Sequence, residues 1–418
     1  MLFSLITQVQ RQLIFRTTTQ MLPSSLIDRL LITLPWRCLF TCLLTFLALP
    51  LHGQERPYEI YLENDQQAAA LPQRLTAFLS WLQQQSIENQ LPGAAVALVS
   101  GNRLIDIRTW GVRSSDKRQP LDENSLFRIA SVSKTFAGTV ASLAIANQPG
   151  AWDLPLADTL PQLQLGTGSV SRTITLKNIV SHTTGLMPHA YSNMLDAGVA
   201  YDDILKKFPE IPTVCPPGRC YGYQNVVFSL IADFVEVATL TSYEEYLQRE
   251  LFEPLGMTSA STGLDNFLGN QQATAPHRRV RGNWRTTTHN PAYYTVTPAA
   301  GINASITDMA IWARANLGGF PEVLPPSLLE RQHNPVIETP RGNYFNRWQG
   351  LEKAYYALGW RVLDYRGVRV VHHGGGVRGY RSEVALVPEF DLGLVVLFNA
   401  ETRLANDIVP AFLDNLLQ

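Results

Sequence analysis

Ser131 and Lys134 stand three residues apart in the stretch FRIASVSKTFAG (127–138) and could form a nucleophile and its activating amine. Residues at positions i and i+3 share one face of a helix. A serine in the first helical turn lies near free backbone N–H groups and the positive end of the dipole, which suits an attack that creates an oxyanion. A lysine can accept the serine proton if burial or a neighbouring cation lowers its pKa. The small, apolar residues around this pair favour that chemistry.

The spacing alone is weak evidence, because a Ser-x-x-Lys pattern is expected roughly once or twice by chance in a chain of this length. A second copy, Ser114 and Lys117, lies in a charged turn before Pro120 and is interpreted as solvated. The alternative for Ser131 is a helix cap beside a solvated lysine. Other parts of the chain have to decide between these readings.

Four further segments, in the same order along the chain, resemble the serine β-lactamase and penicillin-binding protein family, in its class C-like branch. The resemblance extends over about residues 75–415 and implies a β-lactamase/transpeptidase-like fold. The segments are ITLKNIVSHTTGLMP (174–188), PPGRCYGYQNVVFSLIADFVE (216–236), LFEPLGMTSAS (251–261) and HGGGVRGYRS (373–382).

The resemblance implies a role for each site residue. Ser131 would attack a carbonyl to form an acyl-enzyme, and Lys134 would take or share its proton. Tyr223 would hydrogen-bond the hydroxyl and help to activate the water for deacylation. The backbone N–H groups of Ser131 and Gly376 would form the oxyanion hole. The residues implied to contact or position the substrate are Asn225, His373, Gly375 and Gly376.

The histidine of the last segment is ambiguous by one position. The triplets HHG (372–374) and HGG (373–375) both fit, and the spacing to the following Gly-Tyr pair favours His373. Because side chains alternate between the faces of a strand, His372 and His373 cannot both point into one cleft. We expect His373 to face the site.

The resemblance to the family settles two other choices. The pattern Tyr-x-Asn occurs at Tyr191, Tyr223 and Tyr344, but only Tyr223 follows a Pro-Gly turn and precedes a helix. Asn225 could also be the N-cap of that helix. His182 could be mistaken for a base, but the family uses its segment structurally, so we expect it to form hydrogen bonds in the core.

The substrate expectation rests on a departure from the family pattern. Dedicated β-lactamases carry Lys and Thr where this chain has His373 and Gly374, and both side chains serve carboxylate binding there. Their loss favours D-amino-acid peptides or esters over β-lactams. Because histidine titrates near pH 6.5, attraction for a carboxylate is expected to grow as the pH falls. Arg378 or Arg381 could restore a cation. The alternatives are a dedicated class C-like β-lactamase and a non-catalytic penicillin-binding-like protein.

Apolar patterns predict the elements that must position these residues. Helical periodicity predicts an amphipathic helix over residues 71–89. Two apolar runs that flank a Ser-Gly-Asn turn (100–102) predict a β-hairpin. Further strands are expected at 355–365, 368–373, 380–388 and 392–400, with a closing helix at 404–417.

Strands therefore lie towards both chain ends, and helical patterns fill most of residues 131–335. Because strands and helices do not alternate, a doubly wound sheet is disfavoured. The expected architecture is α+β: a mostly antiparallel sheet formed from both chain ends and flanked by helices. The terminal helices would cover one face, and a central helical region would pack on the other. Residues 265–292, rich in Gln, Arg, Thr and Asn, are expected to form a long exposed loop.

Residues 21–53 are typical of a targeting segment, whereas the stretch before Met21 fits no part of one. An apolar run of 14 residues (38–51) follows Arg29 and Arg37 and precedes a polar stretch, as in a secretory signal. We therefore predict a signal peptide over 1–53, with Met21 as a possible true start, then a linker (54–70) and a hydrolase domain (71–418). The alternative is an uncleaved anchor, although the run is shorter than the roughly 20 residues that span a bilayer.

Composition narrows the class of partner. With 34 basic and 35 acidic residues the chain has no excess of positive charge for nucleic acid. It has no H-E-x-x-H, no phosphate-binding glycine loop and no G-x-S-x-G, so no metal, cofactor or nucleophile elbow is expected. We expect a small-molecule or peptide substrate and no membrane span in the mature form, and leave the oligomeric state open. In an exported chain Cys215 and Cys220 could form a disulfide or remain free thiols.

Overall fold

The computed structural model describes residues 65–167 and 170–418. The predicted signal peptide (1–53) lies outside the described residues, as does the predicted linker as far as residue 64. The first helix, α1 (Asp65–Glu88), begins six residues before the predicted start at 71. It therefore takes in the last part of the segment that was predicted as linker.

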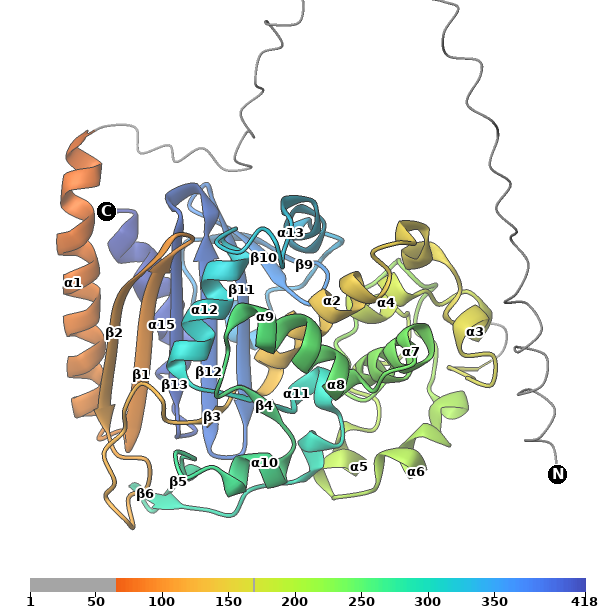
Figure 1. Cartoon of the computed structure of the whole chain (residues 1–418), viewed down its shortest axis with the longest axis horizontal. Helices are drawn as coiled ribbons and strands as arrows, with labels where there is room; N and C mark the ends of the chain where they lie inside the picture. The colour runs from red at the N-terminus through yellow and green to blue at the C-terminus, as the bar shows by residue number, and fades with distance from the viewer. Residues whose placement is uncertain (1–64, 168–169) are drawn as a thin grey trace, which may run out of the picture. The chain divides into compact units, whose positions relative to one another are not determined.

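An antiparallel sheet of eight strands forms the centre of the fold (Figure 1). Its order is β2-β1-β13-β12-β11-β10-β9-β8, so the N-terminal hairpin pairs with the last strand of the chain. The prediction of a sheet built from both chain ends is confirmed. The strands are β1 (Gly93–Ser100), β2 (Arg103–Gly111), β8 (Ile337–Glu338), β9 (Leu351–Tyr356), β10 (Arg361–Tyr365), β11 (Val368–Val377), β12 (Tyr380–Val387) and β13 (Leu392–Phe398).

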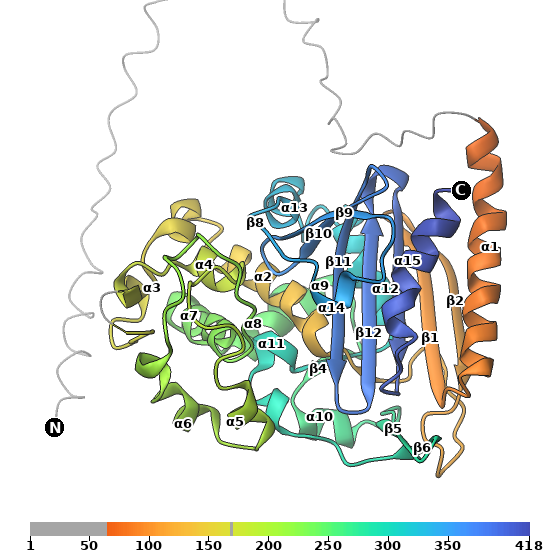
Figure 2. The same ribbon diagram turned by 180° about the vertical axis from the view of Figure 1, so that it is seen from behind.

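Helices cover both faces of this sheet, as expected. The terminal helices α1 and α15 (Ala405–Leu416) lie together on one face, which is seen best from behind (Figure 2). Because helices cover both faces, all eight residues of strand β1 are buried. Val96 packs in the core under the terminal helices, whereas its neighbour Ala97 packs in the core under the central helices.

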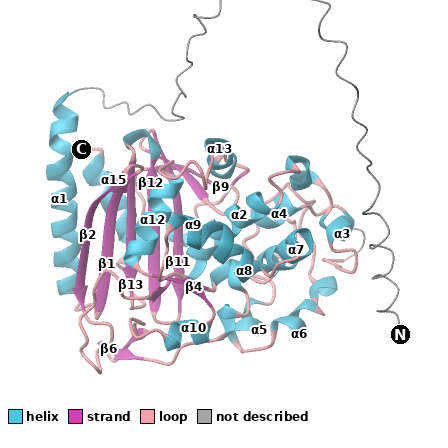
Figure 3. Ribbon diagram, viewed as in Figure 1, coloured by secondary structure: helices cyan, strands magenta, loops and turns pink. Residues whose placement is uncertain are grey.

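The central helices place the serine segment against the sheet (Figure 3). Helix α2 (Ser133–Ala144) is buried over most of its length and contacts α7 (Leu230–Thr239) and α11 (Thr297–Ala300). A Cβ atom on Gly359 would lie 2.4 Å from the Lys134 carbonyl oxygen. Glycine at this position, where φ is +82°, therefore lets the turn between β9 and β10 pack directly on α2.

The other elements are short and connect these layers. Helix α12 (Ile306–Asn316) packs on β1 and β13. The rest are α3 (Leu156–Thr159), α4 (Leu176–Val180), α5 (Ser192–Asp196), α6 (Tyr201–Leu205), α8 (Tyr243–Leu247), α9 (Glu253–Leu255), α10 (Leu264–Gly269), α13 (Pro326–His333), α14 (Gly342–Phe345), β3 (Phe127–Arg128), β4 (Ser261–Thr262) and β7 (Ile302–Ala304).

Two predictions of local structure were wrong. Residues 265–292 are not one long loop, because they contain most of α10 and a hairpin of β5 (His277–Val280) and β6 (Asn283–Thr286). The turn residues Arg281 and Gly282 both have positive φ, as a two-residue hairpin turn requires, but the polar strands hid the pattern. The run 355–365 spans the end of β9 and the whole of β10 rather than one strand.

Cys215 and Cys220 form a disulfide that closes the loop before Tyr221. The bridge selects one of the two alternatives that the sequence left open. Across residues 65–167 and 170–418, none of the helices combines the length and the apolar character needed to cross a membrane.

Candidate active site

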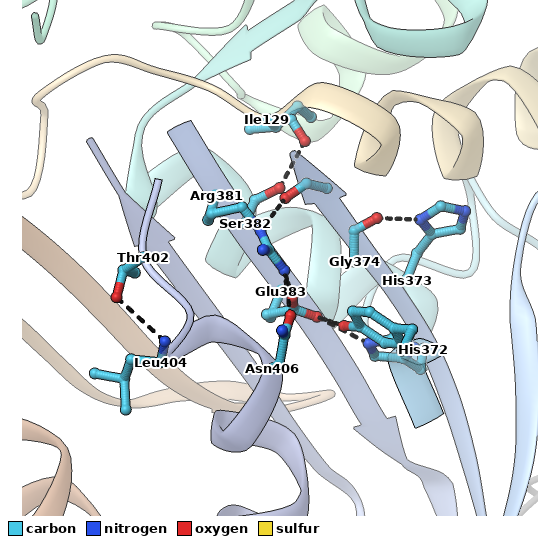
Figure 4. Close-up of polar contacts among 12 residues, drawn as sticks. Ile129, His372, His373, Gly374, Arg381, Ser382, Glu383, Thr402, Leu404 and Asn406 are labelled. Atoms are coloured by element: carbon cyan, nitrogen blue, oxygen red, sulfur yellow. Dashed lines mark hydrogen bonds and ion pairs between the residues drawn. The ribbon is translucent and has the colours of Figure 1, made fainter. Parts of the chain in front are cut away.

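Ser131 lies in a 3₁₀ turn, Ala130–Val132, that leads into α2. Its side chain is partly exposed, whereas the residues on either side of it are buried. Ala130 has a φ of +51°, a strained conformation for a residue with a Cβ atom, and such strain is concentrated at functional sites. The Ser382 hydroxyl of β12 donates a hydrogen bond to the Ile129 carbonyl (2.6 Å), so the sheet holds this turn in place (Figure 4).

Lys134 is completely buried one turn further along the chain. Its Nζ donates hydrogen bonds to Asn225 Oδ1 (2.8 Å) and to the Ala299 carbonyl (2.9 Å). Burial lowers the pKa of Lys134 well below 10.5, and the positive charge of Arg361 lowers it further. Both effects shift the equilibrium of Lys134 towards the neutral amine, which can accept a proton from a serine.

Tyr223 lies beside Ser131 and Lys134. The Nζ atom of Lys134 lies 4.7 Å from the centre of the Tyr223 ring. Burial raises the pKa of Tyr223 above 10, although the interaction with the Ser131 hydroxyl and the charge of Arg361 oppose this effect. Tyr223 is therefore a protonated phenol at neutral pH, able to donate a hydrogen bond but poorly suited to be the resting base.

The two adjacent histidines of β11 lie on opposite faces of the sheet (Figure 4). The ring of His372 packs near Tyr344 on the side of the terminal helices, and its Nε2 donates to Glu383 (3.0 Å). His373 lies on the other side, where its Nε2 is 3.1 Å from the Tyr356 hydroxyl. His373 is the one that faces Tyr356 and the residues around Lys134.

The expectation that His373 titrates near pH 6.5 was wrong. Its Nδ1 lies 2.9 Å from the Gly374 carbonyl, which can only accept, so Nδ1 carries the proton and Nε2 accepts from Tyr356. Burial lowers the pKa of His373 well below 6.5, and Arg361 and Lys134 lower it further. His373 is therefore neutral and offers no charge to a carboxylate as the pH falls towards 6.

Gly374, which occupies the position where dedicated β-lactamases carry threonine, faces away from Ser131. A Cβ atom on Gly374 would lie 2.6 Å from the Tyr344 hydroxyl and 2.7 Å from Glu383. Any side chain at this position would clash on the face that the terminal helices cover. Substituting threonine here would disturb that face instead of adding a hydroxyl beside Ser131.

Gly375 and Gly376 lie where β11 meets the serine turn. A Cβ atom on Gly375 would be 2.4 Å from the Ile129 carbonyl oxygen and 3.1 Å from the Ser131 nitrogen, so only glycine allows this approach. In the part of the chain that the structure describes, β10 pairs with β11 only as far as His372. The segment of β11 that continues towards Gly376 is therefore not paired with β10.

Neither arginine that was considered as a replacement cation lies beside Lys134. Arg381 donates hydrogen bonds to the Gly375 carbonyl (3.2 Å) and to Asn406 of α15 (2.7 Å) (Figure 4). It also forms an ion pair with Glu383 (3.4 Å), so its guanidinium lies near α15. Arg378 is exposed and lines a hollow of about 480 Å³ next to Gly376.

The cation that does face the site is Arg361, which the sequence reasoning missed. It is the first residue of β10 and is partly buried, and its guanidinium carbon lies 5.7 Å from the Tyr356 ring centre and 5.8 Å from that of Tyr223. The only local signal was one charged residue between Trp360 and a short apolar run.

The remaining candidates have other partners, although the ring of His182 packs against that of Tyr223 at 4.4 Å between ring centres. His182 is buried and accepts a hydrogen bond from the Gln224 backbone N–H (3.2 Å), in agreement with a core role. The hydroxyl of Tyr191 donates to the Lys207 carbonyl, and that of Tyr344 donates to Glu383. Residues 65–167 and 170–418 contain no group of three or more His, Cys, Asp or Glu side chains placed to hold a metal ion.

Comparison with known proteins gives a family and several relatives. A family model described as Beta-lactamase matches residues 73–417. An unguisins hydrolase of Aspergillus campestris is 27% identical over 340 residues, which cover 76% of this chain and 60% of that protein. A beta-lactamase of Escherichia coli is 26% identical and is covered over 90% of its length, with 79% of this chain aligned.

A D-aminopeptidase of Gluconobacter oxydans is 27% identical, with 74% of this chain and 56% of that protein aligned. The chain thus spans less than two thirds of the fungal hydrolase and of the D-aminopeptidase. Among solved structures, an octameric penicillin-binding protein homologue from Pyrococcus abyssi superposes with a TM-score of 0.72 at 19% identity, over 82% of this chain and 77% of that one. That superposition supports the fold.

Proposed function

The chain belongs to the beta-lactamase family, and from that premise we propose that it is a serine hydrolase that cleaves amide or ester bonds through an acyl-enzyme on Ser131. The observation that carries this proposal is the state of Lys134. Its amine is buried, bonded to neutral oxygens, and close to the phenol of Tyr223. A non-catalytic binding protein would have no need to bury an amine in this way, since burial of a lysine costs free energy.

In the acylation step, Ser131 Oγ attacks the substrate carbonyl while the Lys134 amine takes its proton. The oxyanion would be stabilised by the backbone N–H groups of Ser131 and Gly376. The leaving group takes the proton back from the lysine, with the Tyr223 hydroxyl as the neighbouring donor. In deacylation the same groups act on water, which returns Ser131 to its free form and releases the acid. Asn225 holds the lysine amine in place through its 2.8 Å hydrogen bond.

We propose D-amino-acid peptides or esters as the substrates. The neutral His373 and the enclosed Gly374 support this choice, because neither supplies the charge or hydroxyl that dedicated β-lactamases carry. The D-aminopeptidase relative is in keeping with it. A dedicated β-lactamase is the second candidate, and it is favoured by alignment over 90% of the length of the Escherichia coli beta-lactamase.

A turnover panel tests the proposal. Nitrocefin, a short-chain p-nitrophenyl ester and a D-Ala-D-Ala peptide are compared, together with labelling by a fluorescent fluorophosphonate. We expect Ser131-dependent labelling and faster turnover of the ester or peptide. Tyr223→Phe should lower turnover. The matched variant Tyr191→Phe should not, because the Tyr191 hydroxyl donates its hydrogen bond to the Lys207 carbonyl. No labelling and no turnover of any substrate would favour a binding protein, and a strong preference for nitrocefin would favour the second candidate.

We also propose that the protein is exported. The sequence of residues 1–53 supports this, and so does the Cys215–Cys220 bridge, because disulfides persist in oxidising compartments. The intact mass of protein recovered outside the cytoplasm should correspond to a chain that begins near Gln54 and carries no free thiol at Cys215 or Cys220. A full-length mass, or two thiols that react with maleimide without reduction, would contradict export with cleavage.

A further inference from the structure

Basic side chains gather at the end of the sheet where β2 stops and where β11 turns into β12. Four segments meet there, namely residues 113–120, 277–286, 377–379 and 401–403. They hold nine of the 34 lysine and arginine residues of the chain but only two of its 35 acidic residues. We call these nine basic residues the basic patch. Because the whole chain has a net charge of −1, the patch concentrates positive charge on one part of the molecule.

The buried His277 joins the four segments into one surface. Its Nε2 accepts a hydrogen bond from the Ser115 backbone N–H (3.1 Å). Its own backbone N–H donates to the Gly379 carbonyl (3.3 Å), and its carbonyl accepts from the Glu401 N–H (3.1 Å). In Figure 1 the hairpin of β5 and β6, which begins at His277, lies at the lower end of the sheet, beside the connection from β2 to β3.

Most of the charge on this surface has no carboxylate partner. Among the described residues, Arg278 is the one member of the basic patch that forms an ion pair, with Glu401 at 2.9 Å. The other carboxylate of the four segments, Asp116, accepts a hydrogen bond from the Thr286 hydroxyl. Every member of the patch except Arg113 is exposed to solvent. An exposed charge can remain solvated at little cost, so the geometry of the hairpin has to show whether these charges serve a partner.

The hairpin of β5 and β6 carries arginines at two positions that disfavour them. Arg278 and Arg285 lie directly opposite each other on the two strands, and like charges in this arrangement are destabilising. Arg281 occupies the first turn position with a φ of +51°, where asparagine, aspartate or glycine is preferred. Residues that break local rules in this way are expected mainly at functional positions. The arrangement therefore favours an anionic partner for these arginines.

One face of the hairpin is fixed on the body of the protein. The side chains of Arg279 and Trp284 both donate hydrogen bonds to the Asn89 carbonyl, just after α1 (2.9 and 3.0 Å). The Arg279 guanidinium carbon also lies 4.9 Å from the centre of the Trp284 ring. Val280, next to the turn, is 53% exposed. The hairpin therefore presents an apolar tip flanked by arginines on a well-supported base.

We propose that the basic patch docks the protein on the surface of a membrane that contains anionic phospholipids. Arginine binds phosphate groups through two parallel N–H donors, and each basic side chain near an anionic membrane adds to the attraction. The exposed Val280 suits the boundary between headgroups and acyl chains. A soluble polyanion would gain nothing from that side chain, which is why a membrane is the preferred partner.

The patch extends to the mouth of the serine site. The hollow of about 480 Å³ beside Gly376 has six charged lining residues: Asp196, Arg278, Arg378, Arg381, Glu401 and Arg403. Three of these arginines belong to the basic patch. Docking would therefore hold the hollow close to the lipid headgroups and bring the site near membrane-bound substrates. The docking itself does not depend on the chemistry at Ser131.

Vesicle sedimentation at low and at high salt tests the proposal. The vesicles contain phosphatidylglycerol and phosphatidylcholine in equal parts, or phosphatidylcholine alone. The test variant is Arg281→Gln/Arg285→Gln. The control Arg331→Gln/Arg369→Gln removes the same charge from exposed arginines of α13 and β11. We expect binding that requires phosphatidylglycerol and weakens with salt. The test variant should lower the partition coefficient roughly 30-fold, about fivefold for each arginine, and the control should not.

Three further measurements keep the outcome unambiguous. Phosphatidylcholine vesicles record any binding through the apolar run 38–51, which needs no anionic lipid. Thermal midpoints show whether each variant is folded, and Arg281→Lys/Arg285→Lys should retain most of the binding because it keeps the charge. Hydrolysis of a soluble p-nitrophenyl ester should be equal in the test and control variants, so that a loss of docking is distinguished from a defect at Ser131.

The proposal is overturned if phosphatidylglycerol adds nothing to the binding seen with phosphatidylcholine alone. It is also overturned if Arg281→Gln/Arg285→Gln binds as tightly as the control. Binding to inorganic polyphosphate without any binding that depends on phosphatidylglycerol would assign the patch to a soluble polyanion instead.

Discussion

Ser131→Ala is expected to lower turnover by roughly a thousandfold or more and to abolish acyl-enzyme formation, because a nucleophile has no substitute in the covalent step. The side chain is partly exposed at the start of a buried helix, and it interacts with Tyr223. The substitution removes one oxygen from a position that the backbone still occupies, so folding should be little affected. Burst kinetics and mass spectrometry of the trapped acyl-enzyme provide the measurement.

The matched control is Ser114→Ala. Ser114 also precedes a lysine by three residues, but Lys117 is exposed and the Ser114 hydroxyl accepts a hydrogen bond from the Asp116 backbone N–H. This change should leave turnover near the wild-type value. If Ser114→Ala were the damaging change and Ser131→Ala the mild one, the nucleophile would have been assigned to the wrong pair.

Lys134→Arg is expected to lower kcat by on the order of a thousandfold although it keeps a basic residue, because arginine is never deprotonated at ordinary pH. In the wild type the pKa of Lys134 lies well below 10.5, through burial and then through Arg361. Activity should therefore rise with pH as the amine loses its proton, and fall as the pH drops below that pKa and the amine becomes protonated. The profile of kcat/KM against pH measures this rise and gives the pKa at which it occurs.

Lys134→Met provides a second variant that removes the base without burying a larger cation. It should be as inactive as Lys134→Arg. The matched control Lys177→Arg changes a lysine that is partly exposed and pairs with Asp153 at 3.6 Å, and it should leave the profile unchanged. Near-normal turnover by Lys134→Arg would show that the serine proton goes elsewhere, and Tyr223 would then be the first alternative to test.

The local sequence was enough to predict most strands of the sheet, whereas the choice of Ser131 over Ser114 as the candidate nucleophile needed the family-like segments elsewhere in the chain. The hairpin of β1 and β2 and the strands β11 to β13 are apolar runs separated by turn residues, and such signals act over a few residues. The choice of Tyr223 over Tyr191 came from the family pattern, which requires a Pro-Gly turn before the tyrosine and a helix after it. The hairpin of β5 and β6 was missed because its strands are polar and their turn carries the only signal.

The sequence by itself determined which residues are available for chemistry: a serine three positions before a lysine, a tyrosine after a Pro-Gly turn, and a glycine-rich strand. Only the tertiary structure decided their charges. The pKa of Lys134 is lowered by burial, where its amine bonds Asn225 and Ala299, which are 91 and 165 residues away in the chain, and by the charge of Arg361 on another strand. His373, which the sequence suggested would titrate, is neutral for the same reason. A pKa depends on desolvation and on charges nearby in space, and neither can be read from a short segment of sequence.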